Sequence, residues 1–170
     1  MISLWGFMGA GKSTIGQEFA KLHGWKWIDS DEQIVLQEGC SIPELFRHHG
    51  EAYFRQLETR FITNLKEKKT RDSADSTILT TGGGMPERAE NRKILKELGN
   101  SYYIYLPFEE IVRRLESDES RPLWNKNELE EMRARFTRRE KIYAEADKII
   151  HALGKTPQQI VEEIAQDLDL

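Results

Sequence analysis

Residues 6–13 read Gly-Phe-Met-Gly-Ala-Gly-Lys-Ser and match the phosphate-binding loop pattern G-x4-G-K-S/T. An apolar run, residues 2–7, precedes the loop and predicts a strand that is buried on both faces. A helical pattern follows, as this loop requires, because its backbone N–H groups and the helix N-terminus together surround phosphate oxygens. A glycine-rich turn with a chance Lys-Ser pair is the alternative, and the flanking pattern argues against it. The chain is therefore restricted to folds in which a buried strand leads through this loop into a helix.

Each residue type in the loop suits one part of a nucleotide that is bound together with Mg²⁺. The glycines let the backbone approach the phosphates, the amine of Lys12 reaches the β- and γ-phosphates, and the hydroxyl of Ser13 can bind Mg²⁺. The residues that we expect to contact the nucleotide here are Gly9, Ala10, Gly11, Lys12, Ser13 and Thr14.

Short apolar runs recur along the chain and predict five strands separated by helices. Right-handed crossovers and a parallel sheet covered on both faces are therefore expected. The predicted fold class is α/β, a three-layer α/β/α arrangement around a five-stranded parallel sheet, with ligands at the carboxyl ends of the strands. The predicted strands are residues 2–7, 25–28, 77–80, 102–106 and 148–150.

Helix signals flank these strands. Ile15, Phe19 and Leu22 share one face of a helix that we expect to end at Gly24. The polar tract 66–76 predicts an exposed loop. Capping patterns predict two further helix starts, at Ser41 with Glu44 and at Thr156 before Pro157.

The length of 170 residues is typical of one domain, so we expect a single unit over residues 1–170. The formal net charge of −4 at pH 7 favours neither a nucleic acid nor an anionic membrane surface as a partner. No apolar run is long enough for a membrane helix, and the N-terminus does not read as a secretory signal. The single cysteine, Cys40, suits a reducing compartment, and we expect a cytoplasmic protein.

Asp29 and Asp31 follow the second predicted strand. One carboxylate can hold the metal, directly or through water, while the other faces the phosphoryl acceptor. The alternative is that an aspartate at this position only caps the next helix. The phosphate loop one strand away makes the catalytic interpretation the better one.

Arg55 and Glu58 lie three residues apart in a predicted helix and can form an ion pair. An arginine oriented in this way can bind a substrate carboxylate through two hydrogen bonds, although an ordinary surface pair is the alternative. Gly82, Gly83 and Gly84 follow the third predicted strand and let a small ligand approach the backbone, unless they only form a tight turn.

Arginines are concentrated in the C-terminal half of this acidic chain. Residues 117–126 are polar, and we expect them to form a mobile lid that brings Arg121 over the phosphates. Such an arginine neutralises charge that develops during phosphoryl transfer, whereas a solvated charged loop is the alternative. The four histidines have no metal-binding spacing, and we expect no metal role for them.

A phosphate loop, a carboxylate pair and several arginines together indicate phosphoryl transfer from a nucleotide to a small anionic acceptor. In its order of motifs the chain resembles the shikimate kinase family over nearly its whole length. The resemblance implies ATP-dependent phosphorylation of the 3-hydroxyl of shikimate, in aromatic amino-acid biosynthesis, on a fold similar to that of nucleoside-monophosphate kinases. The motifs are residues 6–14, Asp29-Ser-Asp31, Phe54-Arg-x-x-Glu58, Gly82-Gly83-Gly84, Arg121-Pro-Leu and Arg139-x-x-x-Tyr143.

For the acceptor, the resemblance implies that Asp31 contacts shikimate and is the candidate base, while Arg55 and Arg139 hold the carboxylate. A helical segment over about residues 31–64 contributes much of this pocket. The other acceptor residues that it implies are Gly83, Gly84, Phe46, Phe54 and Glu58.

For the nucleotide, the resemblance implies that Lys12 and Arg121 contact the phosphates and that Arg114 lies near the adenine. It also implies that Ser13 and Asp29 form the Mg²⁺ site. ATP and Mg²⁺ are therefore the expected cofactors.

The chain departs from the family pattern after the second acceptor arginine. Many members have a proline between that arginine and the tyrosine, whereas residues 140–142 are Glu-Lys-Ile here. Either Arg138 or Arg139 can therefore be the second acceptor arginine.

Two other functions remain open. A gluconate-type small-molecule kinase would also take an anionic polyol, but the Phe-Arg-x-x-Glu and triple-glycine motifs favour shikimate. A nucleotide-binding regulatory protein without catalysis would not need both aspartates and the acceptor arginines. The family resemblance further implies a monomer.

Overall fold

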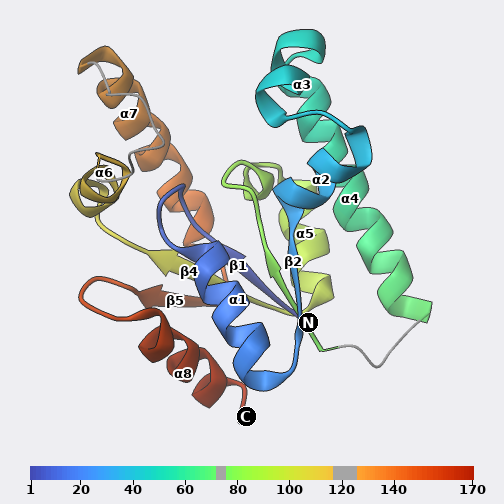
Figure 1. Cartoon of the computed structure of the whole chain (residues 1–170), viewed down its shortest axis with the longest axis vertical. Coiled ribbons are helices and arrows are strands. Elements are labelled where there is room, and N and C mark those ends of the chain that lie inside the picture. The colour runs from blue at the N-terminus through green and yellow to red at the C-terminus, as the bar shows by residue number, and fades with distance from the viewer. Residues whose placement is uncertain (72–75, 117–125) are drawn as a thin grey trace.

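Five parallel strands form one sheet in the order β2-β3-β1-β4-β5 (Figure 1). The computed structural model describes residues 1–71, 76–116 and 126–170. The sheet confirms the predicted α/β fold, and each predicted strand overlaps an observed one. The strands are β1 Ile2–Trp5, β2 Lys26–Asp29, β3 Thr77–Thr80, β4 Asn100–Tyr105 and β5 Lys148–His151.

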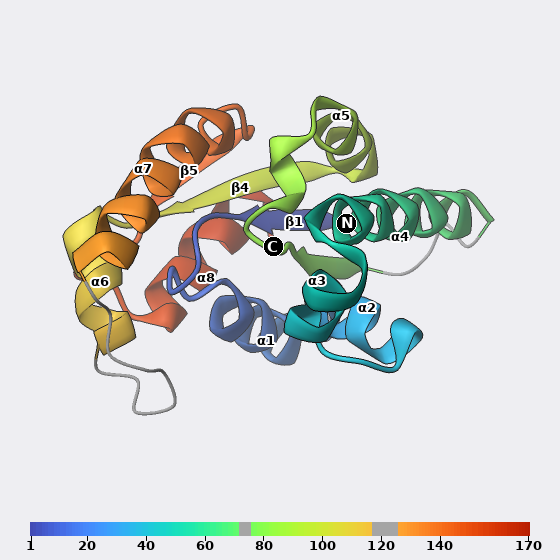
Figure 2. The same ribbon diagram turned by 90° about the horizontal axis from the view of Figure 1, so that it is seen from above.

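Helices cover both faces of the sheet. Helices α1 and α8 lie together on one face, whereas α5 and α7 lie on the other (Figure 2). Helices α2, α3 and α4 follow β2 and gather on one side of the molecule, away from α7 (Figure 1). The helices are α1 Lys12–His23, α2 Ser30–Glu38, α3 Ile42–His49, α4 Glu51–Arg71, the 3-10 helix η1 Met85–Glu87, α5 Ala89–Leu98, α6 Phe108–Glu116, α7 Lys126–Tyr143 and α8 Pro157–Asp167.

Local sequence signals set several of these boundaries. Helix α1 ends at Gly24, which adopts a left-handed conformation with φ of 68°, as predicted. The side chain of Ser41 accepts from the backbone of Glu44, and the Glu44 carboxylate accepts from the backbone of Ser41. Thr156 caps α8 through a similar reciprocal pair. The predicted capping box at Ser41 and the predicted cap at Thr156 are therefore confirmed.

Two predictions about helix faces and ends are wrong. Leu22 is 63% exposed, because the buried face of α1 is centred between Gly16 and Phe19, about a quarter-turn away. The polar tract predicted as a loop begins instead inside α4, which continues to Arg71. Lysine and glutamate favour helices without an apolar stripe, and Lys66 pairs with Glu97 of α5.

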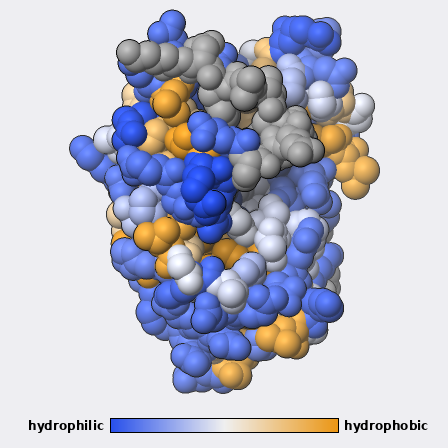
Figure 3. Space-filling view, turned by 60° about the vertical axis from the view of Figure 1, so that its left-hand side comes forward, coloured by the Kyte–Doolittle hydropathy of each residue, from blue (hydrophilic) through white to orange (hydrophobic). Residues whose placement is uncertain are grey.

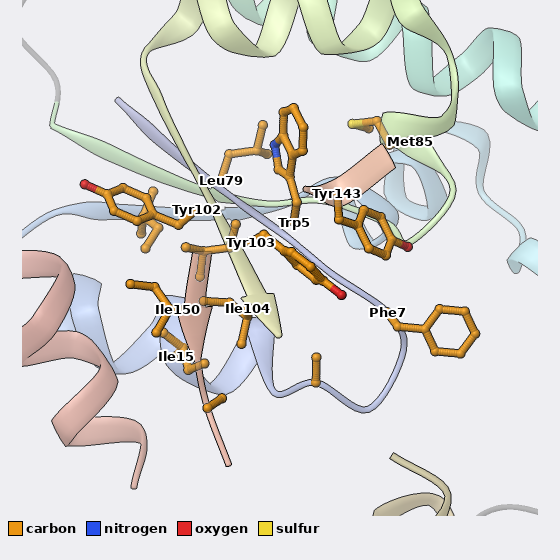
Figure 4. Close-up of a cluster of buried hydrophobic side chains, with 14 of the residues drawn as sticks. Trp5, Phe7, Ile15, Leu79, Met85, Tyr102, Tyr103, Ile104, Tyr143 and Ile150 are labelled. Atoms are coloured by element: carbon orange, nitrogen blue, oxygen red, sulfur yellow. The ribbon is translucent and has the colours of Figure 1, made fainter. Parts of the chain in front are cut away.

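The core lies on both faces of β1, whose four residues are all buried. Large aromatic side chains from several elements fill it, among them Trp5, Phe7, Tyr103 and Tyr143 (Figure 4). On the face shown in Figure 3 the surface is mostly hydrophilic, with separate small hydrophobic areas. In the part of the chain that the structure describes, no helix is long and apolar enough to cross a membrane.

Candidate active site

The carboxyl ends of β1, β2 and β3 bring the sequence motifs together. The phosphate-binding residues lie in the loop after β1 and at the start of α1, and the three glycines follow β3. Asp29 ends β2, and Asp31 lies in the first turn of α2. A cleft of about 360 Å³ lies between these segments. Its lining residues are Met8, Gly9, Gly11, Lys12, Ser13, Thr14, Asp29, Asp31, Thr81, Gly82 and Gly83.

The phosphate loop has the backbone conformation that an anion site needs. Gly9 and Gly11 have φ values of 77° and 92°, a region that residues with side chains rarely adopt. Gly11 stands at the N-cap of α1, and no side chain caps that helix end. The N–H groups of the first helical turn are therefore available to phosphate oxygens.

Lys12 lies at the centre of this cleft. Its Nζ donates to the carbonyl oxygens of Gly6 and Phe7 at 2.9 and 3.0 Å. Burial lowers the pKa of Lys12 to about 8, although the charges of Asp31 and Asp29 act in the opposite direction. The Lys12 ammonium is thus surrounded by hydrogen-bond acceptors. A bound phosphate would raise its pKa and keep it charged in alkaline solution.

We expect the affinity for nucleotide to fall as pH rises through about 8. Below that pH the Lys12 amine is already protonated in the free protein. Above it, ATP either binds the neutral amine more weakly or binds with uptake of a proton, and the cost of that protonation lowers the observed affinity. Calorimetric titration of a non-hydrolysable ATP analogue between pH 7 and 9.5 measures this, with proton uptake read from the buffer dependence of the enthalpy. Constant affinity and no proton uptake at pH 8.5 would contradict it.

Asp29 is both a helix cap and a candidate metal ligand. Its Oδ1 accepts from the backbone N–H groups of Asp31 and Glu32 at 3.0 and 3.2 Å. Its Oδ2 accepts from the hydroxyls of Ser13 and Thr80 at 3.0 and 2.8 Å. The capping alternative is therefore correct for this residue, and the same carboxylate still places an oxygen beside Ser13.

Asp31 lies in the first turn of α2 and faces Gly82 of the glycine run. Its Oδ1 is buried and has no hydrogen-bond partner among the residues that the structure describes. Burial raises the pKa of Asp31, and Asp29 adds to this effect, while Lys12 and Arg55 oppose it. A carboxylate oxygen that is buried but unpaired is available to a hydroxyl of a bound acceptor.

Arg55 projects from α4 and is held by two carboxylates. Glu58 accepts from Nη1 at 2.7 Å, and Glu51 accepts from Nε and Nη2 at 3.2 and 2.8 Å. The side chain of Glu58 is fully buried; burial raises its pKa and the Arg55 charge opposes this. The guanidinium packs on Gly84, where a Cβ would lie closer than 3.0 Å to it.

Arg139 projects from α7 toward the same glycine run. Its side chain is 7% exposed, and a Cβ at Gly83 would lie 3.3 Å from its Nη1. The side chain of Arg138 is 61% exposed and pairs with the other oxygen of Glu87, Oε2, at 3.3 Å. One helical turn later, the hydroxyl of Tyr143 donates to the carbonyl oxygen of Gly83 at 2.6 Å. Of the two alternatives, the structure brings Arg139 to the site.

The two predicted phenylalanines, Phe46 and Phe54, lie beside Arg55. Phe54 is buried and packs edge-to-face against Phe46 of α3, with 5.2 Å between ring centroids. Phe46 is 38% exposed. The guanidinium of Arg55 lies 5.5 Å from the centroid of Phe54, so this aromatic pair covers one side of the arginine.

Arg114 lies on the other side of the phosphate loop. It lines a small cavity of about 110 Å³ together with Ala10, Gly11, Thr14 and residues at the start of α8. Its Nε donates to Glu110 at 3.0 Å. The proposed lid, residues 117–126, and its Arg121 lie outside the described residues, apart from Lys126 at the start of α7.

Among the polar residues of the site that were not predicted, three contact predicted residues directly. Thr80 donates to Asp29, buried Ser30 accepts from the N–H of Gly82 at 2.8 Å, and Glu87 pairs with Arg139. Ser30 lies between the two predicted aspartates, and Thr80 ends the strand before the glycines. Their positions next to predicted site residues are the only sequence signal that could have identified them. Nothing in the sequence near Glu87 marks it as part of the site.

Comparison with known proteins gives one consistent family. A family model described as shikimate kinase matches residues 8–169. Among curated proteins, the shikimate kinase of Persephonella marina is 41% identical over 163 residues, which cover 96% of this chain and 95% of that protein.

Solved structures agree. A shikimate kinase from Acinetobacter baumannii in complex with shikimate matches with a TM-score of 0.85 and 34% identity, covering 98% of this chain and 91% of that one. The shikimate kinase from Aquifex aeolicus matches with a TM-score of 0.84 and 36% identity, covering 99% of this chain and 95% of that one.

Proposed function

The chain belongs to the shikimate kinase family, and we propose that its cleft carries out that family's reaction, transfer of the γ-phosphoryl group of ATP to the 3-hydroxyl of shikimate. The products are shikimate 3-phosphate and ADP. One observation supports the assignment of residues best. Asp31, Arg55 and Arg139 each lie against a different member of the glycine run, so one carboxylate and two cations surround a strip of bare backbone.

This strip suits a small acceptor with a carboxylate at one end and hydroxyls at the other. The guanidinium groups of Arg55 and Arg139 are partly or fully buried, and such groups bind a carboxylate strongly through charge-assisted hydrogen bonds. The missing side chains of Gly83 and Gly84 leave room for the acceptor against the backbone. Asp31 lies between this strip and Lys12, where the hydroxyl and the γ-phosphate meet.

The residues of the phosphate loop suit ATP with Mg²⁺. The uncapped N-terminus of α1 and Lys12 fit the phosphates, and Arg114 fits the neighbourhood of the base. Ser13 and Asp29 present hard oxygen ligands 3.0 Å apart. No group of three or more His, Cys, Asp or Glu residues suited to a metal occurs in the described ranges, and Mg²⁺ in kinases needs only one or two protein oxygens beside phosphate and water. When bound, Mg²⁺ would neutralise charge on the phosphates.

Asp31 orients the 3-hydroxyl and takes its proton as the oxygen attacks the γ-phosphorus. Its raised pKa makes the carboxylate a stronger base than an exposed aspartate. Lys12 stabilises the negative charge that spreads over the transferred group. Because such a transition state is loose, the positions of these groups contribute at least as much as their basicity.

The two alternatives from the sequence are not favoured. The matching family model and the curated Persephonella marina protein, which matches nearly the whole chain, are both described as shikimate kinase. A regulatory protein without catalysis would have no need for a buried Asp31 oxygen that has no hydrogen-bond partner within the described part of the chain. Phosphorus NMR of the product distinguishes the acceptors, because a phosphoryl group on the 3-hydroxyl of shikimate gives a defined coupling to one ring proton.

We further propose that the enzyme works as a monomer in the cytoplasm. Every group assigned to the cleft comes from one chain, and the single cysteine, Cys40, is free.

Replacing Arg55 with Ala should raise the KM for shikimate while the KM for ATP stays close to its original value. The guanidinium lies on the acceptor side, against Gly84, and does not line the phosphate loop. We expect an increase of about 10–100-fold, since a charge-assisted hydrogen bond to the substrate carboxylate is lost. Steady-state kinetics with each substrate varied in turn measures this, and an equal rise in both KM values would argue against the assignment.

A further inference from the structure

We propose that Glu87 is a positioning residue for Arg139, and through it for the carboxylate of the acceptor. Glu87 ends the 3-10 helix η1, three residues after the glycine run, and none of the sequence motifs includes it. The inference rests on the proposed function, in which Arg139 holds that carboxylate. It adds a residue that selects one orientation of the arginine.

The contact between the two side chains leaves one part of the guanidinium available. Oε1 of Glu87 accepts from Nε of Arg139 at 2.7 Å and lies 2.7 Å from Nη2. These two nitrogens form one edge of the planar group. Nη1 is left near Gly83, on the side of the cleft. A single carboxylate oxygen thus fixes which nitrogen the acceptor meets.

The other acceptor arginine is held along the same edge. One oxygen of Glu51, Oε1, accepts from both Nε and Nη2 of Arg55, whose Nη1 also donates to Glu58 at 2.7 Å. Both arginines therefore use the edge formed by Nε and Nη2 for a carboxylate of the protein, and both guanidinium groups lie against glycines of the run. This repeated arrangement on two different helices indicates a role in orienting the arginines, beyond a surface ion pair.

The backbone around Glu87 is itself well supported. Nη1 of Arg92 donates to the carbonyl oxygens of Pro86 and Glu87 at 2.8 and 3.0 Å. Nδ2 of Asn91 donates to the carbonyl oxygen of Met85 at 2.9 Å. These bonds hold η1 against α5, so that the carboxylate reaches α7 from a fixed position.

Helix α7 is also fixed one turn after Arg139, on the same helix face. Tyr143, one turn later, donates to Gly83, and its ring packs 5.2 Å from that of Tyr103 (Figure 4). The helix is therefore held without Glu87. The guanidinium of Arg139 also lies 5.8 Å from the ring centroid of Phe7, and Glu87 is the carboxylate that pairs with it among the described residues. Loss of Glu87 should let the guanidinium change rotamer while the fold is retained.

The test is a pair of variants, Glu87→Ala and Glu87→Gln, in steady-state assays. We expect Glu87→Ala to raise the KM for shikimate about tenfold, with kcat and the KM for ATP nearly unchanged. Glu87→Gln should lie between this variant and the original enzyme, because its amide oxygen can still accept from Nε. The control is Glu90→Ala, three residues after Glu87. It removes an exposed partner of Arg88 and should change neither KM.

A double-mutant cycle with Arg139→Gln separates positioning from a general structural effect. If Glu87 acts through Arg139, adding Glu87→Ala to Arg139→Gln produces no further rise in the shikimate KM. Additive effects, an unchanged or lowered shikimate KM in Glu87→Ala, or a parallel rise of both KM values with a lower melting temperature would each overturn the proposal. Failure of the proposed function would show differently, as absence of shikimate-dependent turnover in the unmodified enzyme.

Discussion

Replacing Asp31 with Asn lowers kcat by about 10²–10⁴-fold and leaves ATP affinity close to that of the unmodified enzyme. The amide has nearly the shape of the carboxylate but cannot take the proton of the attacking hydroxyl. In the structure, Oδ1 of Asp31 is buried and unpaired among the described residues, while Lys12 is held by the carbonyl oxygens of Gly6 and Phe7 in the phosphate loop. Turnover is measured by coupled ADP release, and affinity by calorimetry with an ATP analogue.

The neighbouring exposed Glu32 provides the control. It lies in the same first turn of α2, and Glu32→Gln removes one negative charge without changing a group that faces the cleft. We expect near-original kinetics for this variant. Turnover of Asp31→Asn close to that of Glu32→Gln would reject Asp31 as the base, and loss of nucleotide binding would show that its main role lies on the ATP side.

Alanine at the three consecutive glycines should have three different effects. None of the three has a positive φ, so alanine fits the backbone and the effect comes from the added Cβ. At Gly82 the Cβ would lie closer than 3.0 Å to the Asp31 carboxylate, and displacing this base by about 1 Å should lower kcat about 10²-fold. At Gly84 it would displace the guanidinium of Arg55, which should raise the KM for shikimate with a smaller change in kcat.

Gly83→Ala serves as the milder member of the series. Its Cβ would lie 3.3 Å from Arg139 and 3.4 Å from the hydroxyl of Tyr143, so small shifts can accommodate it. At Gly82 and Gly84 the added Cβ displaces only the ends of side chains, so we expect all three variants to fold. Melting temperatures check this. Equal effects on kcat and KM at all three positions would contradict the assignment of one functional group to each glycine.

Much of the fold follows from local sequence signals. Residues 77–80 were predicted as a strand and form β3 with the same bounds, because an apolar run ends there at glycines. Strand β4 begins at Asn100, two residues before its prediction, since pairing with β1 extends it beyond the apolar run. Helix α7 was not predicted, because its sequence is mostly charged and only scattered residues such as Met132 and Phe136 are buried.

The candidate site was predictable where function requires a motif, and not where tertiary packing completes it. The phosphate loop has a fixed spacing, and Asp29 with Asp31 follows a strand, so both were found from the sequence. The contact of Glu87 with Arg139 joins residues 52 positions apart. The sequence around either residue gives no sign of this contact, because it forms only when η1 packs against α7.

The most direct test of the central claim is ADP formation from ATP and Mg²⁺ with shikimate, with gluconate and without an acceptor. We expect turnover that depends on shikimate and remains at the background rate with gluconate. Turnover that responds to gluconate alone, or ATP binding without stimulation by either acceptor, would contradict the assignment of this cleft to shikimate phosphorylation.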